Sequence, residues 1–99
     1  MKYWTVYLLR CADESLYCGI TKDLDRRIQE HNYGIGCRYT RSRLPVRIVW
    51  SSGPLTKPEA YKQEYRIKRM GKIAKEALVA EEIRAGLRNE FLDIRAPSG

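Results

Sequence analysis

Residues 3–11, and again residues 16–20, form hydrophobic stretches rich in β-branched, aromatic and aliphatic side chains. Such residues favour β-strands, and the polar segment between them, residues 13–15, predicts a hairpin. A loop of odd length would put Tyr7 and Tyr17 on the same face of this hairpin. A two-residue turn would separate them, but it prefers glycine or asparagine, so we expect the odd-length loop or a bulge.

A basic helix is expected directly after the hairpin. Asp23 stands where its side chain can accept a hydrogen bond from a free backbone N–H, and apolar residues then recur at helical spacing. Arg27 and His31 are one helical turn apart, so their side chains would lie on one face of this helix.

The rest of the chain predicts one more strand and two more helices. The expected segments are an exposed basic loop over residues 34–43, a strand over residues 46–51, a helix from residue 57 to about residue 70, and a helix over residues 73–85. Thr56 and Glu59 have the spacing of a capping box, and Gly71 separates the two helices. Ile73, Ala77, Leu78 and Ile83 supply the apolar periodicity of the last helix.

This order of elements is an α+β pattern, and 99 residues suffice for one hydrophobic core. We expect a single domain over residues 1–85. Residues 86–99 would form a C-terminal extension, partly docked through Leu87, Phe91, Leu92 and Ile94 or flexible, with a loose end at residues 96–99.

The charge balance changes this picture, because 19 lysines and arginines outnumber 12 acidic residues and leave a net charge of +7. Such an excess favours a polyanionic partner, although many small basic proteins bind no nucleic acid. No apolar run is long enough to cross a membrane, and the N-terminus lacks the organisation of a signal peptide, so we expect a cytoplasmic protein without a membrane partner. The three cysteines lack the paired spacing of disulfide frameworks or zinc sites, so reduced thiols are expected.

Glu64 is the carboxylate with the clearest chemical interest. It shares a helical stripe with Ala60, Ile67 and Lys68, which would turn it toward the sheet, where a charge needs a partner or a metal ion. The ordinary alternative is an ion pair with Lys68 on a solvated face. Arg27 could likewise be one of many surface arginines. His31 could be a capping or core-edge residue, and both tyrosines could simply cover the core.

A set of motifs favours a catalytic role of these residues over the ordinary alternatives. In chain order they are Thr5-Val6-Tyr7, Tyr17-Cys18-Gly19, residues 23–31, residues 36–41 and residues 59–68. In order and spacing they resemble the GIY-YIG nuclease domain, over about residues 3–80, and in particular its small stand-alone bacterial members. Thr5 replaces the first glycine of the family's name and Cys18 replaces an isoleucine, but both tyrosines and Gly19 remain.

The resemblance implies a three-stranded antiparallel sheet flanked by helices. It also implies one active site lined by Tyr7, Tyr17, Arg27, His31 and Glu64. Glu64 would hold one divalent cation, Mg²⁺ or Mn²⁺, and a tyrosine would help to deprotonate the attacking water. Because a free tyrosine has a pKa of about 10, nearby cations would have to lower it, and His31 is a competing base.

Nucleic-acid contacts are expected around this site. Lys22, Arg26, Arg38, Arg41 and Arg43 would contact phosphates, Tyr39 would stack, Lys68 would assist, and Gly19 would let a phosphate or water approach the strand.

Two hypotheses of different classes follow. The first is a metal-dependent DNA endonuclease with relaxed or structure-directed specificity and no small-molecule cofactor. The second is a nucleic-acid-binding or adaptor module with weak or no catalysis. RNA instead of DNA as partner, and the oligomeric state, stay open. A thiol-dependent role of Cys18 is a third alternative, disfavoured because Cys18 should face the core.

Overall fold

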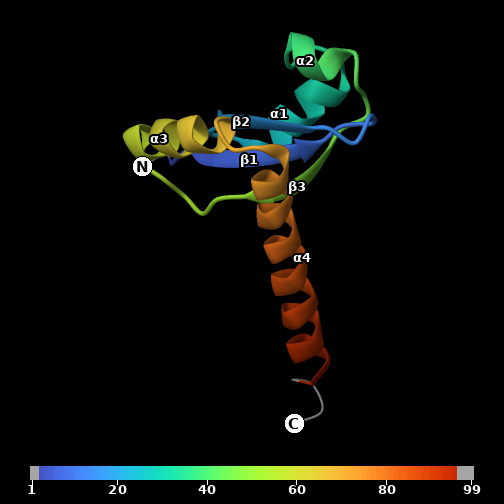
Figure 1. Ribbon diagram of the computed structural model, residues 1–99, viewed down its shortest axis with the longest axis vertical. Helices are drawn as coiled ribbons and strands as arrows, with labels where there is room; N and C mark the ends of the chain where they lie inside the picture. Colours follow the sequence, from blue (N-terminus) through green and yellow to red (C-terminus); the bar gives the residue numbers. More distant parts are fainter. Residues whose placement is uncertain (1–2, 96–99) are drawn as a thin grey trace.

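The computed structural model describes the backbone of residues 3–95 and the side chains of residues 3–85 (Figure 1). Its elements, in chain order, are β1 (Thr5–Arg10), β2 (Leu16–Thr21), α1 (Leu24–Asn32), α2 (Arg38–Arg41), β3 (Arg47–Ser51), α3 (Lys57–Lys68) and α4 (Lys72–Arg95). The strands form a three-stranded antiparallel sheet in the order β2-β1-β3, flanked by the helices. The α+β fold expected from the sequence is therefore confirmed.

The hairpin of β1 and β2 has the odd-length loop that keeps the two tyrosines on one face. Tyr7 pairs with Gly19, and Leu9 pairs with Tyr17. The loop closes with a hydrogen bond of 2.9 Å from the Cys11 N–H to the Ser15 carbonyl. Its last residue, Glu14, has a φ of 70°. This left-handed residue after a tight turn is typical of three-residue hairpin loops.

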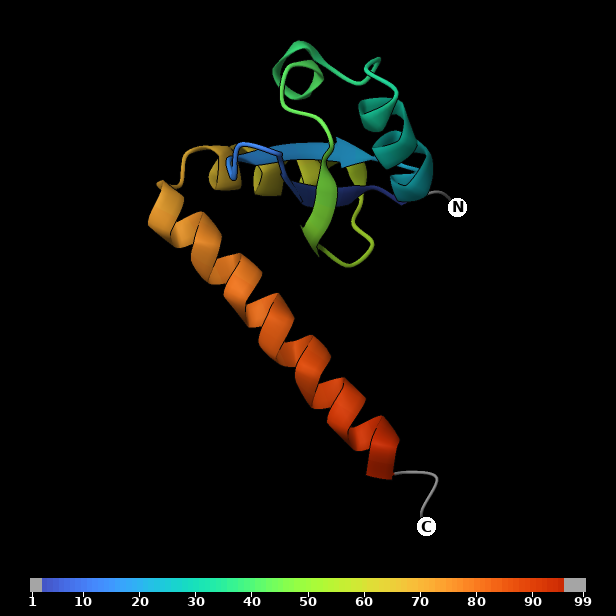
Figure 2. The same ribbon diagram turned by 90° about the vertical axis from the view of Figure 1, so that its right-hand side faces the viewer.

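Two hydrophobic clusters cover the two faces of the sheet. On one face Val6, Leu8 and Cys18 pack with residues of α3 and α4, chiefly Ala60, Ile67 and Val79. On the other face Tyr7, Leu9, Cys11 and Val46 pack with partly buried residues that include Leu24 and Ile28 of α1. In Figure 2, α1 and α2 lie above the strands and α3 is seen behind them.

Side-chain caps fix where the two site-bearing helices begin. The Asp23 carboxylate accepts a hydrogen bond of 3.2 Å from the Arg26 N–H at the start of α1. At the start of α3, Thr56 and Glu59 form the expected capping box. Both caps were predicted from sequence, and each satisfies backbone donors that a helix start leaves free.

Two segments differ from expectation. The basic loop contains one short helix, α2, which is too short to produce a periodic pattern in the sequence. The last helix does not end near residue 85 but continues to Arg95 and projects away from the sheet (Figure 1). The docking expected of Leu87, Phe91, Leu92 and Ile94, and the loose end, concern side chains and residues outside the described part of the chain.

The apolar stripe expected on the last helix is also wrong in part. Ile73 is 88% exposed and Ile83 is 56% exposed, whereas Val79 is buried against the sheet. Leu78 packs beside Val79. The helix meets the sheet over a short stretch and then leaves it, so a stripe drawn along its whole length fails. No helix within residues 3–95 is long and apolar enough to cross a membrane.

Candidate active site

The hairpin and α1 bring both tyrosines, Arg27 and His31 together on one face of the sheet. The ring centroids of Tyr7 and Tyr17 are 6.5 Å apart. The His31 imidazole lies 6.1 Å from the Tyr7 ring and 5.4 Å from the Tyr17 ring. The Arg27 guanidinium lies beside Tyr7. Four of the five proposed catalytic side chains thus lie close together.

A buried chain of hydrogen bonds runs through this cluster. The Tyr7 hydroxyl and the His31 Nε2 atom are 3.1 Å apart, and the His31 Nδ1 atom is 2.7 Å from the Thr40 hydroxyl. Tyr7 is 1% exposed, and His31 and Thr40 are fully buried. The imidazole therefore has a partner for each ring nitrogen, which fixes its orientation.

Two glycines allow this close packing. A side chain at Gly36 would collide with the His31 imidazole and come within 2.8 Å of the His31 Cα atom. A side chain at Gly19 would meet the Tyr7 hydroxyl at 2.5 Å. The space above Gly19 is thus taken by the Tyr7 phenol, which corrects the expectation that a phosphate or water approaches the strand there.

Arg27 connects the buried cluster with an open pocket. One guanidinium nitrogen, Nη2, donates a 3.0 Å hydrogen bond to the Gly36 carbonyl, and Nη1 donates one of 3.1 Å to Glu30. On its outer side, Arg27 lines a pocket of about 440 Å³ together with Lys22 and Arg26. These two cations are members of the expected nucleic-acid-binding set.

Burial controls protonation in the cluster. Burial raises the pKa of Tyr7, and the adjacent Arg27 guanidinium offsets only part of this increase. It also raises the pKa of Tyr17, and the hydrogen bond with Cys37 adds to this. The pKa of His31 is lowered, first by burial and then by the positive charge of Arg27. At neutral pH both phenols therefore keep their protons and the imidazole is neutral.

Glu64 occupies a different position from the other four residues. It lies on α3, which packs on the opposite face of the sheet from Tyr7, mainly against the edge strand β2. Its side chain is 18% exposed, and its carboxylate is 3.2 Å from the Lys68 ammonium. Within residues 3–85, no hydrogen bond or ion pair joins Glu64 to the tyrosines, Arg27 or His31. The sequence offered an ion pair with Lys68 on a solvated face as the ordinary alternative for Glu64. The structure has this ion pair, but the carboxylate is largely shielded from solvent.

The donor set around Glu64 is compatible with one kind of metal binding only. Within the described side chains, no group of three or more His, Cys, Asp or Glu residues is placed to hold a metal ion. Mg²⁺ is often bound by one or two carboxylates, with waters and substrate phosphates completing its shell. A single carboxylate such as Glu64 fits that mode and not a cage made of protein ligands.

The other predicted contact residues are spread around the cluster. Tyr39 stacks on Tyr17 with ring centroids 5.8 Å apart, and the Arg43 guanidinium lies 3.9 Å from the Tyr39 ring. Arg43 also pairs with Asp13 at 2.9 Å, so its charge is partly engaged. Arg38 and Arg41 are exposed on α2.

The structure adds site residues that the sequence did not single out. Thr40 holds His31, and Gly36 makes room for the imidazole. Both lie within residues 36–41, one of the motifs of the resemblance, which was the only signal for them. Burial raises the pKa of the Cys18 thiol to about 11, which disfavours a thiol-dependent reaction near neutral pH.

Known proteins resemble this chain over most of its length. The family model of the GIY-YIG catalytic domain matches residues 3–76. A UPF0213 protein of Vibrio cholerae is 51% identical over 79 residues, covering 78% of this chain and 77% of its own. A UPF0213 protein of Natronomonas pharaonis is 46% identical, covering 78% of this chain and 91% of its own.

Two solved structures are also similar to this chain. The solution NMR structure of a UPF0213 protein from Bacillus halodurans has a TM-score of 0.52 and 44% identity, covering 81% of this chain and 84% of its own. That of a protein from E. faecalis has a TM-score of 0.53 and 32% identity, with coverages of 84% and 88%. With the motif tyrosines, Arg27 and His31 gathered in one cluster, the chain belongs to the GIY-YIG family of nuclease domains, among relatives named UPF0213.

Proposed function

We propose that this protein is a divalent-metal-dependent endonuclease that hydrolyses phosphodiester bonds in DNA, with relaxed or structure-directed specificity. The observation that carries the proposal is the placement of Arg27. Its guanidinium borders an open pocket of mixed charge on one side, where Lys22 and Arg26 accompany Asp23 and Glu30, and the buried hydrogen-bond chain of Tyr7, His31 and Thr40 on the other. A phosphate in the pocket would therefore meet a fixed cation next to groups that can move a proton.

Each side chain has a role in this proposal. Arg27 offers N–H donors to phosphoryl oxygens, where charge accumulates in the transition state. Neutral His31, with its proton on Nδ1 and donated to Thr40, can accept the Tyr7 proton at Nε2. Tyr7 can then take a proton from the attacking water without first ionising in solution, which its raised pKa would prevent. We thus assign His31 as the terminal base, with a tyrosine as the group next to water.

Glu64 would hold the Mg²⁺ or Mn²⁺ ion, which when bound supplies positive charge for the phosphate oxygens. Lys68 would keep the Glu64 carboxylate compensated when the ion is absent. Lys22, Arg26, Arg38, Arg41 and Arg43 would supply contacts to phosphates, with Tyr39 as a stacking surface. Such contacts add affinity without reading sequence and weaken as salt rises.

Two observations favour the second candidate function, a nucleic-acid-binding or adaptor module with weak or no catalysis. Tyr7 is 1% exposed, and Glu64 pairs with Lys68 on the other face of the sheet. In the endonuclease, binding of DNA must therefore expose Tyr7 and free Glu64. In the adaptor, neither rearrangement is needed.

Nicking of supercoiled plasmid DNA in Mg²⁺ or Mn²⁺ tests the proposal. We expect Arg27→Ala to lower the nicking rate by about a hundredfold or more, because one fixed donor to a developing charge is lost. Glu64→Ala should abolish nicking, and added Mg²⁺ or Mn²⁺ should not restore it. Arg84→Ala, which removes an exposed arginine on α4, is the matched control and should nick like the wild type.

The outcomes separate the two candidates. DNA binding without nicking in either metal would overturn the endonuclease and support the adaptor. Nicking that survives both Arg27→Ala and Glu64→Ala would come from a contaminating nuclease and would equally overturn the assignment.

A further inference from the structure

A second aromatic and basic surface begins at the far end of the pocket beside Arg27. Trp4 lines that pocket together with Lys22, whose ammonium lies 5.1 Å from the Trp4 ring centroid. The Trp4 ring is in turn 6.3 Å from the ring of Tyr61 on α3. The Lys57 ammonium lies beside both rings, 5.8 Å from the first centroid and 5.9 Å from the second. The pocket therefore continues onto α3 through paired aromatic rings and lysines.

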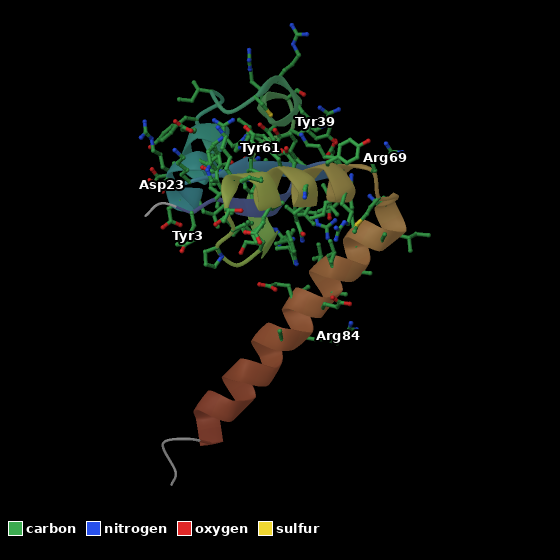
Figure 3. The ribbon with its side chains drawn as sticks, turned by 90° about the vertical axis from the view of Figure 1, so that its left-hand side faces the viewer. Tyr3, Asp23, Tyr39, Tyr61, Arg69 and Arg84 are labelled. Carbon is green, nitrogen blue, oxygen red and sulfur yellow. The ribbon has the colours of Figure 1, made fainter. Side chains whose placement is uncertain are left out.

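The surface extends along α3 to its C-terminal end. Tyr65 lies one helical turn beyond Tyr61, and these rings are 63% and 49% exposed. The Arg69 guanidinium lies 5.2 Å from the Tyr65 ring and donates a 2.6 Å hydrogen bond to its hydroxyl. A second pocket of about 420 Å³ opens there, lined by Lys62, Tyr65, Arg66 and Arg69. Figure 3 shows Tyr61 on α3, Arg69 just past the C-terminal end of α3, and Arg84 on α4 away from them.

Along α3 the charges of this surface are positive, whereas Asp23 and Glu30 also line the pocket beside Arg27. None of the ion pairs within residues 3–85 includes Lys57, Arg66 or Arg69. The acids of α3 are engaged elsewhere, since Glu59 closes the capping box and Glu64 turns toward the sheet and pairs with Lys68. Cations and exposed aromatic rings without competing carboxylates are suited to a polyanion whose bases can stack.

We infer that Trp4, Tyr61 and Tyr65, with Lys22, Lys57 and Arg69, form a track for single-stranded DNA that leads from the pocket beside Arg27 to the C-terminal end of α3. The rings would stack on unpaired bases and the cations would hold the phosphates. In a duplex the base faces are covered by their neighbours, so the rings could not be used. The inference rests on the proposed function for the choice of DNA, and it adds that the substrate carries a single-stranded segment.

The test measures binding without cleavage. The protein carries Arg27→Ala, is kept in EDTA, and is titrated with fluorescein-labelled oligothymidine and with a duplex of equal length. We expect the Tyr61→Ala/Tyr65→Ala pair to weaken binding of oligothymidine by about tenfold or more and to leave duplex binding almost unchanged. Tyr33→Ala is the matched control, because Tyr33 is 80% exposed but lies at the end of α1.

A charge-reversal pair tests the end of the track. Arg69→Glu should weaken binding of oligothymidine and reduce its salt dependence, whereas Arg84→Glu makes the same charge change on α4 and should have a much smaller effect. Stacking has its own optical readout, since Trp4 and Trp50 are the two tryptophans of the chain. In a Trp50→Phe background, saturating oligothymidine should quench the Trp4 fluorescence.

Unchanged binding of oligothymidine by the tyrosine double variant, or an equal loss for the duplex, would overturn the track. Tighter binding of oligouridine than of oligothymidine would overturn the assignment to DNA. Failure of the track and failure of the proposed function give different results. A wild type that never nicks DNA but loses oligothymidine binding through Tyr61 and Tyr65 would keep the track and overturn the endonuclease.

Discussion

Gly36 and His31 show how single residues decide the geometry of the cluster. Gly36→Ala would place a methyl group 2.6 Å from the His31 Cγ atom and 2.8 Å from its backbone Cα. The His31 Cα atom belongs to the backbone and cannot rotate away from this methyl group. The His31 imidazole should therefore shift and lose its contacts with Tyr7 and Thr40. We expect a loss of about 1–3 kcal/mol in the free energy of unfolding, measured by urea titration.

The control for this change is Gly53→Ala, because no heavy atom lies within 4 Å of the added Cβ atom. Its urea midpoint should stay close to that of the wild type. Equal midpoints for both variants would show that Gly36 does not constrain His31.

His31 should make the stability of the protein depend on pH in a defined window. Its pKa is lowered from 6.5 in the folded protein, by burial and by Arg27. As the pH falls below that value, the unfolded chain takes up a proton that the folded protein does not. The free energy of unfolding should therefore decrease by up to about 1.4 kcal/mol per pH unit, until the folded-state pKa is reached. Above the unfolded-state pKa, His31 should contribute no pH dependence.

Urea unfolding between about pH 7.5 and 5.5 measures this slope, in a window where carboxylates with pKa values near 4 stay ionised. The variant His31→Gln should remove the slope that His31 contributes. An imidazole that titrates at or above 6.5 in the NMR spectrum of the folded protein would contradict the expectation.

At the scale of the elements, the hairpin loop holds a strain that can be relieved. Glu14 has a φ of 70°, a left-handed conformation that costs a non-glycine residue about 1 kcal/mol. Its side chain is 77% exposed and 4.0 Å from Arg10, a contact of little value. Glu14→Gly should thus raise the free energy of unfolding by about 0.5–1 kcal/mol, seen as a higher urea midpoint.

Glu14→Ala separates the two contributions. It removes the weak ion pair and keeps the Cβ atom that opposes the left-handed conformation. It should therefore stabilise the hairpin far less than glycine does. A gain equal to that of Glu14→Gly would assign the effect to the side chain and not to the backbone.

The elements also show what the sequence can and cannot predict. The apolar, aromatic composition of two segments predicted the strands, and the odd length expected for the loop between them put Tyr7 and Tyr17 on one face, because the side-chain period of a strand is two. The capping residues of α1 and α3 specified where those helices start. Helical spacing showed that Glu64 shares a side of α3 with Ala60 and Ile67. It did not show which face of the sheet α3 would cover, since that depends on contacts between distant segments.

The same limit explains Thr40. It lies on a helix of four residues, too short for any periodicity, and its partner is nine positions earlier in the chain. The α2 segment must fold back onto α1 before the hydroxyl can reach the imidazole. Only the family motif drew attention to this stretch.

At the scale of the whole molecule, α4 is a long arm held at one end. The longest dimension of the protein is 49 Å, and most of α4 projects beyond the sheet (Figures 1 and 2). Within residues 3–85, its polar anchor is Glu76, which receives hydrogen bonds of 2.6 and 2.7 Å from the two terminal nitrogens of Arg10. Val79 and Leu78 supply the apolar contact beside it.

We therefore expect Glu76→Ala to destabilise the protein more than other changes on the arm. The Arg10 side chain is 13% exposed, so the loss of its carboxylate partner leaves a largely buried charge without compensation. Glu76 itself is 34% exposed, and solvent screening reduces the cost, which we place at about 1–2 kcal/mol in the urea-derived free energy of unfolding. Glu82→Ala, at an exposed position six residues further along α4, should leave this free energy unchanged. Equal effects of the two variants would mean that the apolar contact alone holds the arm and that the paired guanidinium does not orient it.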